Sequence, residues 1–303
     1  MTGRRFKIAL VVVARNAEAT IAEALESIVT QDYEDFQLVF FDDCSSDSTP
    51  DIAARFRDRS VFTEGRAPQW IGRAAALGRA FEMCSSEYVI VCDADDRLRP
   101  GALRRLAEEA DRTGADMIIA PIVRISGGKE KILRPCGKIE SLDDMTIDTV
   151  HFSLCNKLLR LETVKRGCKP FPGIDRWEDL GVIARFMATE PKISVIDQPV
   201  YEYIRRRGIT TLSTSEKNLI VSDRIAIAEK LDGWFRERGL SDKYGDFIRH
   251  VKFYATINMA RTPDRDLRRW SSAYPEVLGS VMSLRHVPLL YRLICKIVFL
   301  FYR

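Results

Sequence analysis

Apolar and polar positions alternate in blocks along the first part of the chain, which predicts alternating strands and helices. Apolar runs rich in β-branched residues are typical of strands covered on both faces. They occur at residues 7–13, 36–41, 60–63, 88–92 and 116–125. Between the first two runs, Ile21, Leu25 and Ile28 recur at helical spacing. This order predicts an α/β fold with a mainly parallel sheet flanked by helices.

Four residues mark expected helix ends. Asn16 is expected to cap the helix after the first strand, because its side-chain oxygen suits an N-cap position. Pro50 and Pro100 are each expected to start a helix. The N–H groups of a first helical turn have no partner within the helix, so the missing N–H of proline costs no hydrogen bond there. Gly114 is expected to stop the helix after Pro100, since glycine readily adopts a left-handed conformation.

The pattern changes after about residue 126, where loops and short helices replace the regular alternation. Two more strands are expected at residues 193–196 and 200–204, as antiparallel additions to the sheet. After these strands the apolar spacing is helical. The chain is therefore predicted to form an α/β domain at residues 1–212 and a C-terminal helical region at residues 213–303.

Composition narrows the class of protein. The 47 basic residues nearly balance the 43 acidic ones, and a net charge of +4 gives no reason to expect nucleic acid as a partner. The seven cysteines are odd in number and lack Cys-x-x-Cys spacing, which argues against a disulfide framework or a structural zinc site. Reduced thiols fit a cytoplasmic protein.

Three predicted strands end in polar clusters, at Arg15-Asn16, at Asp42-Asp43 and at residues 93–96. Ligands of open α/β sheets bind just beyond the carboxyl ends of the strands. In Asp93-Ala94-Asp95-Asp96, three like charges within four residues repel each other. A bound Mg²⁺ or Mn²⁺ would remove that repulsion and could share its other positions with phosphates. The alternative is a solvated acidic turn.

Three other clusters each allow two interpretations. Asp42 and Asp43 could accept hydrogen bonds from a base or a ribose, or belong to a helix-capping turn. Glu178-Asp179 could supply a general base, or be the acidic first turn that helix dipoles favour. The arginines at 205–207 could clamp a diphosphate, or form a solvated basic strand end.

Taken in order, these segments resemble glycosyltransferase family 2, whose members invert configuration and have the GT-A nucleotide-binding fold. The resemblance covers about residues 7–211. Residues 11–18, including Ala14 and Arg15, look like the family's opening strand and uridine-side loop. Residues 40–47 look like its Asp-Asp-Gly-Ser-x-Asp element, and residues 93–96 match its Asp-x-Asp signature.

Further along the chain, Cys155–Arg160, Trp177–Leu180 and Tyr203–Thr210 resemble later elements of the family, the last being its arginine-rich loop over the donor diphosphate. Two departures stand out. Cys44 replaces a usual glycine, and the segment 70–80 lacks the family's asparagines and central arginine, for which Arg73 is the substitute.

The resemblance implies roles for individual residues. Asp95 would hold Mn²⁺ or Mg²⁺, with Asp93 either assisting or reaching the ribose. Asp179 would be the base, and Glu178 would orient or cap. The donor, a nucleoside-diphosphate sugar of the UDP type, would contact the following residues: Ala14, Arg15, Asp42, Asp43, Arg73, Asp93, Ala94, Arg206 and Arg207. The acceptor would be a saccharide or lipid-linked hydroxyl in cell-surface polysaccharide synthesis.

Two other functions remain open. A metal-dependent nucleotidyltransferase would need a glycine-rich phosphate loop with a lysine, which residues 14–20 lack. A glycosyltransferase-like nucleotide-binding protein without activity would fit the altered segment at residues 72–80.

The C-terminal tail at about 285–303 predicts an amphipathic helix. Arg292, Lys296 and Arg303 fall within one narrow arc, and the other faces are apolar. Such a helix could lie at the cytoplasmic face of an anionic membrane. The alternative is a helix packed on the domain or in a homodimer interface.

Overall fold

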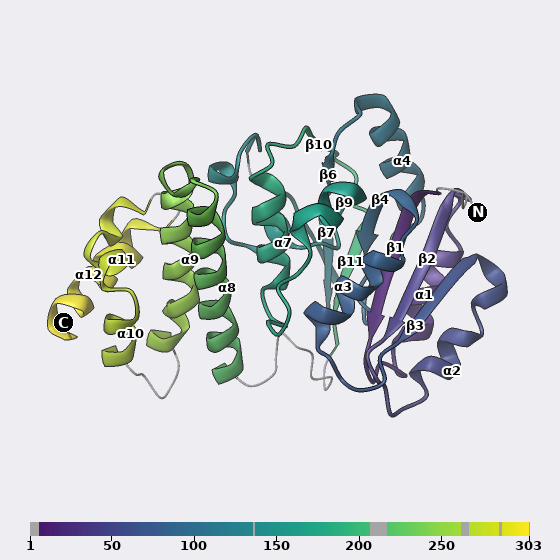
Figure 1. Cartoon of the computed structure of the whole chain (residues 1–303), viewed down its shortest axis with the longest axis horizontal. Coiled ribbons are helices and arrows are strands. Elements are labelled where there is room, and N and C mark those ends of the chain that lie inside the picture. Colours follow the sequence, from purple (N-terminus) through teal and green to yellow (C-terminus); the bar gives the residue numbers. More distant parts are fainter. Residues whose placement is uncertain (1–5, 136, 207–216, 262–266, 285–286, 303) are drawn as a thin grey trace. The chain divides into compact units, whose positions relative to one another are not determined.

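The computed structural model describes residues 6–135, 137–206, 217–261, 267–284 and 287–302. The chain divides into two compact units, drawn in Figure 1 with colours that follow the sequence. The first unit contains residues 1–140 and 149–209, and the second contains residues 141–148 and 210–303. The short segment 141–148 therefore belongs with the helices at the end of the chain.

A seven-stranded sheet forms the centre of the first unit, in the order β10-β6-β9-β4-β1-β2-β3. All its neighbouring strands are parallel except β9, which is antiparallel to both β4 and β6. The strands are β1 (Phe6–Ala14), β2 (Phe36–Asp42), β3 (Val61–Arg66), β4 (Ser86–Val91), β6 (Met117–Ile119), β9 (Lys157–Arg160) and β10 (Ile193–Val195). The predicted α/β class and largely parallel sheet are confirmed.

The central strands are buried along almost their whole length, as their unbroken apolar runs predict. Their register fixes where they end: Ala14 of β1 lies opposite Asp42 of β2, and Val11 of β1 lies opposite Val91 of β4. The polar residues after β1, β2 and β4 therefore come to the same edge of the sheet.

A second sheet of four strands has the order β5-β11-β7-β8. The strands are β5 (Arg97–Leu98), β7 (Ile122–Ser126), β8 (Lys129–Leu133) and β11 (Tyr201–Arg205). The strand predicted at 116–125 is thus two strands in two sheets. Pro121 stands at the break, where it has no N–H to continue a ladder.

The prediction that the last two strands are antiparallel additions to one sheet was wrong. β10 is parallel to β6, and β11 lies in the second sheet, parallel to β7 and antiparallel to the short β5. The antiparallel strand of the main sheet is β9. The chain reaches it from β6 through two strands of the second sheet and short helical turns, without the single crossover helix that returns a chain to a parallel strand.

Helices connect the strands of the first unit (Figure 1). The main ones are α1 (Ile21–Val29), α2 (Thr49–Ala54), α3 (Arg73–Met83), α4 (Ala102–Thr113) and α7 (Glu178–Met187), with single turns at η1 (Arg57–Arg59), α5 (Thr149–Phe152), α6 (Leu161–Thr163) and η3 (Val164–Cys168).

Two of the four predicted helix ends match the structure closely. Pro50 lies in the first turn of α2, and Gly114 ends α4 in the left-handed conformation. α4 begins two residues after Pro100. Asn16 does not cap α1, which begins only at Ile21; Asn16 has a φ of 50° and its side chain accepts a hydrogen bond from Ser46 N–H instead.

In the second unit the regular elements among the described residues are all helices, as predicted for the end of the chain. The long helices α8 (Lys217–Glu237) and α9 (Ser241–Arg261) lie side by side (Figure 1). The shorter elements are η2 (Leu142–Asp144), α10 (Leu267–Ala273), α11 (Pro275–Gly279), η5 (Val281–Ser283) and α12 (Leu289–Tyr302). Among the described residues, no helix has both the length and the apolar character needed to cross a membrane.

Candidate functional site

The turn after β4 brings three carboxylates together. Asp93, Asp95 and Asp96 each place an oxygen within 4.8 Å of the others. Both oxygens of Asp96 are used within the protein: one accepts from Tyr201 Oη–H at 2.7 Å and the other from Ile204 N–H at 2.7 Å. Asp96 therefore fastens the acidic turn to β11. Asp93 is also engaged, since one of its oxygens pairs with Arg73 at 2.5 Å and the other accepts from Cys155 Sγ–H at 3.4 Å. This leaves Asp95 as the carboxylate best placed to hold a cation, with Asp93 beside it.

Electrostatics at this turn favour a bound cation. Burial, together with the charge of Asp93, raises the pKa of Asp95. The same two causes, with Asp95 added, raise the pKa of Asp96 to about 8. The oxygen donors are those that Mg²⁺ and Mn²⁺ prefer. The residues present thus fit the predicted divalent cation.

Arg73 links this acidic turn to the first turn of α7. Its guanidinium pairs with Asp93 at 2.5 Å and with Glu178 at 2.5 Å. Burial opposes its charge, but these two carboxylates raise the pKa of Arg73 well above its usual value. We predicted a donor contact for Arg73; in the structure its charge is engaged by carboxylates from two other segments. It therefore brings the predicted metal ligands and the predicted base into one network.

Asp179 has the features expected of a base that awaits a proton. One carboxylate oxygen accepts from Leu154 N–H at 3.2 Å, while the other is buried with no hydrogen-bond partner in the described part of the chain. Burial raises the pKa of Asp179 to about 6, although Arg73 lowers it. Buried polar atoms are normally paired, so this oxygen is available to a hydrogen-bond partner that the described residues do not supply.

Glu178 differs from Asp179 in that its carboxylate is bound to Arg73. It is 5% exposed and bound to Arg73, and burial, with the charge of Asp179, raises its pKa to about 8. The predicted orienting role fits this arrangement, because an acid held by a guanidinium is poorly available to a substrate.

Asp42 and Asp43 are both buried and organise the loops around them. Asp43 accepts from the N–H groups of Ile71 and Gly72 at 2.9 and 3.0 Å, just before α3. Asp42 accepts from Ser45 N–H at 3.1 Å and pairs with Arg66 at 3.0 Å. Their contacts with a nucleotide remain predictions.

Cys44 adopts a left-handed backbone conformation in the turn after β2. Its φ of 59° lies in the left-handed region, where the glycine usual in the resembled family would be unstrained. The side chain of Cys44 is only partly buried, so the added atoms find room.

The remaining predicted donor contacts lie around the same edge. Ala14 ends β1 and Ala94 lies in the acidic turn, and both are buried. The Arg15 guanidinium lies 4.8 Å from the ring centroid of Trp70. Arg206 donates to the backbone carbonyl of Asp95 and pairs with Glu23 at 2.7 Å. Arg207 lies outside the described residues.

Sequence reasoning missed three residues of this site. Tyr201 donates to Asp96 and accepts from Asp93 N–H at 3.2 Å. Trp70 is 59% exposed beside Arg15, and a tryptophan just before a predicted helix was a usable signal in the sequence. Asp175 accepts from Ala74 N–H at 3.0 Å in the first turn of α3, a contact that spans 101 residues and leaves no local pattern.

Replacing Gly72 by alanine is expected to destabilise the protein by about 2 kcal/mol, because φ is +87° there and the added Cβ would overlap the Asp175 carboxylate. The matched control is Gly78→Ala inside α3, the helix that Gly72 precedes, where a Cβ meets no atom within 4 Å. That change should stabilise by about 0.5–1 kcal/mol. Urea unfolding measures both, and equal effects would contradict the packing described here.

Comparison with known proteins agrees with this geometry. The model of the family described as "Glycosyl transferase family 2" matches residues 9–165, slightly more than half of the 303 residues. The succinoglycan biosynthesis protein ExoO of Rhizobium meliloti is 35% identical over 37% of this chain. The poly(ribitol-phosphate) beta-N-acetylglucosaminyltransferase TarS of Staphylococcus aureus is 22% identical over 91% of it. The chain spans only 32% and 50% of the lengths of these two relatives.

Solved structures share the fold. The structure of S. aureus TarS residues 1–349 with UDP-GlcNAc has a TM-score of 0.73 at 19% identity, covering 98% of this chain and 89% of that one. The mannosyltransferase PcManGT from Pyrobaculum calidifontis, solved with GDP-Man and Mn²⁺, has a TM-score of 0.54 at 15% identity, covering 99% and 82%. The α/β fold of this chain is thus the GT-A fold. The family match and the strand-end acidic cluster agree: the chain belongs to glycosyl transferase family 2.

Proposed function

We propose that the protein transfers a sugar from a UDP-sugar to a hydroxyl of a saccharide or lipid-linked acceptor, with inversion of configuration at the anomeric carbon. The transfer takes place in the cytoplasm and contributes to cell-surface polysaccharide synthesis. The observation that carries the proposal is the network in which Arg73 joins Asp93 of the acidic turn to Glu178, next to the unpaired oxygen of Asp179. A cation site and a base side by side are what transfer from a diphosphate to a hydroxyl requires.

The comparisons support the donor class. TarS has been solved with UDP-GlcNAc and with UDP, and ExoO is named for the biosynthesis of a polysaccharide. Asp95 and Asp93 would hold Mn²⁺ or Mg²⁺, which when bound neutralises charge on the diphosphate leaving group.

The chain's own residues supply the rest of the mechanism. Asp179 removes the proton from the acceptor hydroxyl, whose oxygen forms a bond to the anomeric carbon as the bond to the diphosphate oxygen breaks. This single displacement inverts the configuration. The electron pair leaves with the nucleoside diphosphate, whose charge the Arg206 guanidinium helps to stabilise.

A thermal-shift titration tests the donor and cation sites together. UDP with Mn²⁺ should raise the melting temperature by more than the sum of their separate effects, because each strengthens binding of the other to the folded protein. Metal-dependent turnover is then sought across a panel of nucleoside-diphosphate sugars. Stabilisation without turnover of any donor would indicate an inactive relative, and stabilisation by nucleoside triphosphates alone would favour nucleotidyl transfer.

The pH dependence of transfer should report the base. Asp179 acts only when deprotonated, and burial raises its pKa to about 6. We therefore expect kcat/KM to fall as pH decreases through about 6, approaching tenfold per pH unit below it. Rates between pH 5 and 8 with saturating Mn²⁺ measure this, with Asp179→Asn as the control that should lack the inflection. A flat profile over this range would contradict the assignment.

A further inference from the structure

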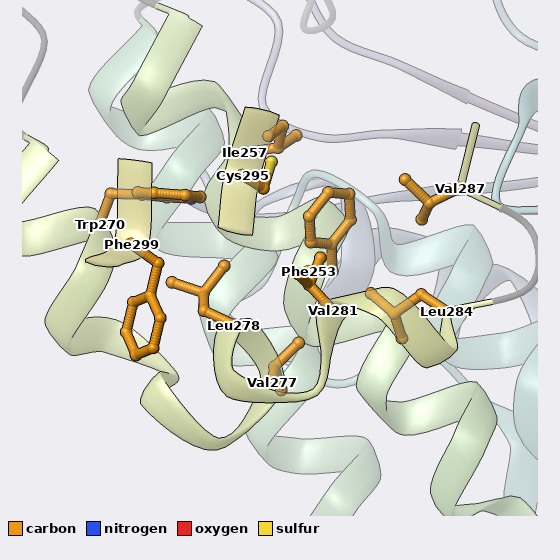
Figure 2. Close-up of a cluster of buried hydrophobic side chains, with 10 residues drawn as sticks. All are labelled: Phe253, Ile257, Trp270, Val277, Leu278, Val281, Leu284, Val287, Cys295 and Phe299. Atoms are coloured by element: carbon orange, nitrogen blue, oxygen red, sulfur yellow. The ribbon is translucent and has the colours of Figure 1, made fainter. Parts of the chain in front are cut away.

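The helix α12 has one buried face and one exposed face. Cys295 and Phe299 are buried and belong to the hydrophobic cluster of the second unit, shown in Figure 2. There they lie among side chains such as Trp270 and Leu278. This packing fixes the rotation of α12 about its own axis. Its opposite face is therefore a defined surface of the unit.

The exposed face is apolar throughout. At about 100° per residue, seven large apolar side chains fall within one arc of about 140°. In order around the helix they are Leu289, Leu300, Leu293, Ile297, Leu290, Phe301 and Ile294. Their exposures run from 43% for Leu293 to 81% for Phe301. Isolated exposed apolar residues are common, but a continuous stripe of this size marks an interaction surface.

Basic side chains border this arc on one side. Lys296 lies about 20° and Arg292 about 60° beyond Leu289. They donate to the carbonyls of Gly279 at 2.9 Å and Met282 at 2.6 Å, and so also fasten α12 to the turns before it. The basic stripe predicted from the sequence thus lies at the edge of the exposed face and is partly engaged by the protein itself.

The surrounding sequence is strongly basic. Residues 267–303 contain one acidic residue, Glu276, against six basic ones: Arg268, Arg269, Arg285, Arg292, Lys296 and Arg303. A contact between two copies through α12 would bring two basic surfaces together, which the repulsion of like charges opposes. An anionic surface, in contrast, complements it.

We propose that α12 binds the surface of an anionic phospholipid bilayer. The apolar arc enters the boundary between headgroups and acyl chains, and the basic edge remains among the lipid phosphates. The helix lies in the plane of the membrane, because its 14 residues span only about 21 Å, less than the hydrocarbon thickness of about 30 Å. This inference concerns location and is independent of the proposed sugar transfer.

Vesicle sedimentation with the full chain tests the proposal. Vesicles of phosphatidylcholine with one third phosphatidylglycerol should bind the protein about tenfold more strongly than phosphatidylcholine alone. Ile297→Glu, at a position 54% exposed on the arc, should lower this binding about tenfold or more. The matched control is Ile132→Glu on β8, 46% exposed, which should leave binding within about twofold of the wild type.

Leu290→Glu, at a position 66% exposed, is a second variant of the arc, and melting curves establish that each variant is folded. The proposal is overturned if the wild type does not bind anionic vesicles, or if Ile297→Glu and Leu290→Glu both bind like the wild type. It is also overturned if light scattering shows a dimer that Ile297→Glu dissociates and that does not sediment with vesicles. None of these readouts requires a donor or an acceptor, so failure here leaves the proposed function untouched.

Discussion

Replacing Asp95 by asparagine is expected to reduce sugar transfer about 1000-fold and to abolish the added thermal stabilisation by Mn²⁺ with UDP. Asp95 lies within 4.8 Å of Asp93 and Asp96, and Asp96 already has both oxygens bonded to β11. Loss of Asp95 therefore leaves Asp93 as the remaining carboxylate for the cation. The factor corresponds to about 4 kcal/mol, in the range that a catalytic cation contributes.

The fold should survive this change, because burial and the neighbouring charge already raise the pKa of Asp95 in the metal-free protein. A neutral asparagine removes that repulsion, so the melting temperature without metal should stay the same or rise. Asp58→Asn, at an exposed position on η1, is the matched control and should behave like the wild type. Wild-type turnover in Asp95→Asn would rule out the metal-site assignment.

Replacing Asp179 by asparagine should lower kcat about 1000-fold while the KM for the donor changes little. A general base contributes about 10²–10⁴ in rate, and asparagine retains the acceptor for Leu154 N–H but cannot take a proton. Steady-state kinetics with varied donor separate the two parameters. Donor binding, followed by thermal shift, should persist.

The neighbouring Glu178→Gln is the matched comparison for Asp179→Asn. Glutamine can still accept a hydrogen bond from Arg73, so only about a tenfold loss of kcat is expected from the disturbed network.

The stability of the Asp179→Asn variant should not fall. At pH 8 the wild type must keep the buried Asp179 carboxylate charged, which costs folding free energy, and a neutral asparagine removes that cost. Activity should therefore be lost without loss of stability. If Glu178→Gln lowered kcat more than Asp179→Asn did, Glu178 would be the base and Asp179 the orienting residue.

Much of the main sheet could be predicted because its strands are buried on both faces and carry continuous apolar runs. β1, β2 and β4 show this pattern, and the polar residues after them reach one edge through parallel register. The direction of β9 and the transfer of β11 to a second sheet were not predictable this way. An apolar run reports burial, but it contains no information on which neighbour a strand pairs with.

The site was predictable where its residues are close in sequence and unpredictable where they meet only in space. The turn at residues 93–96 can be recognised in the sequence because it has three aspartates within four residues. The pairing of Arg73 with Glu178 spans 105 residues, and that of Tyr201 with Asp96 also spans 105. Such contacts depend on how separate elements pack, which no local periodicity records.

The bridge formed by Arg73 has a consequence for turnover. Because its guanidinium already balances Asp93 and Glu178, the acidic site carries a positive charge supplied by the protein itself. A chelator should therefore remove a bound cation reversibly without unfolding the protein. In a zinc finger, by contrast, the fold requires the ion. Because these charges are balanced within the protein, the fold would not depend on whether Asp93 and Asp95 hold a cation at a given moment of turnover.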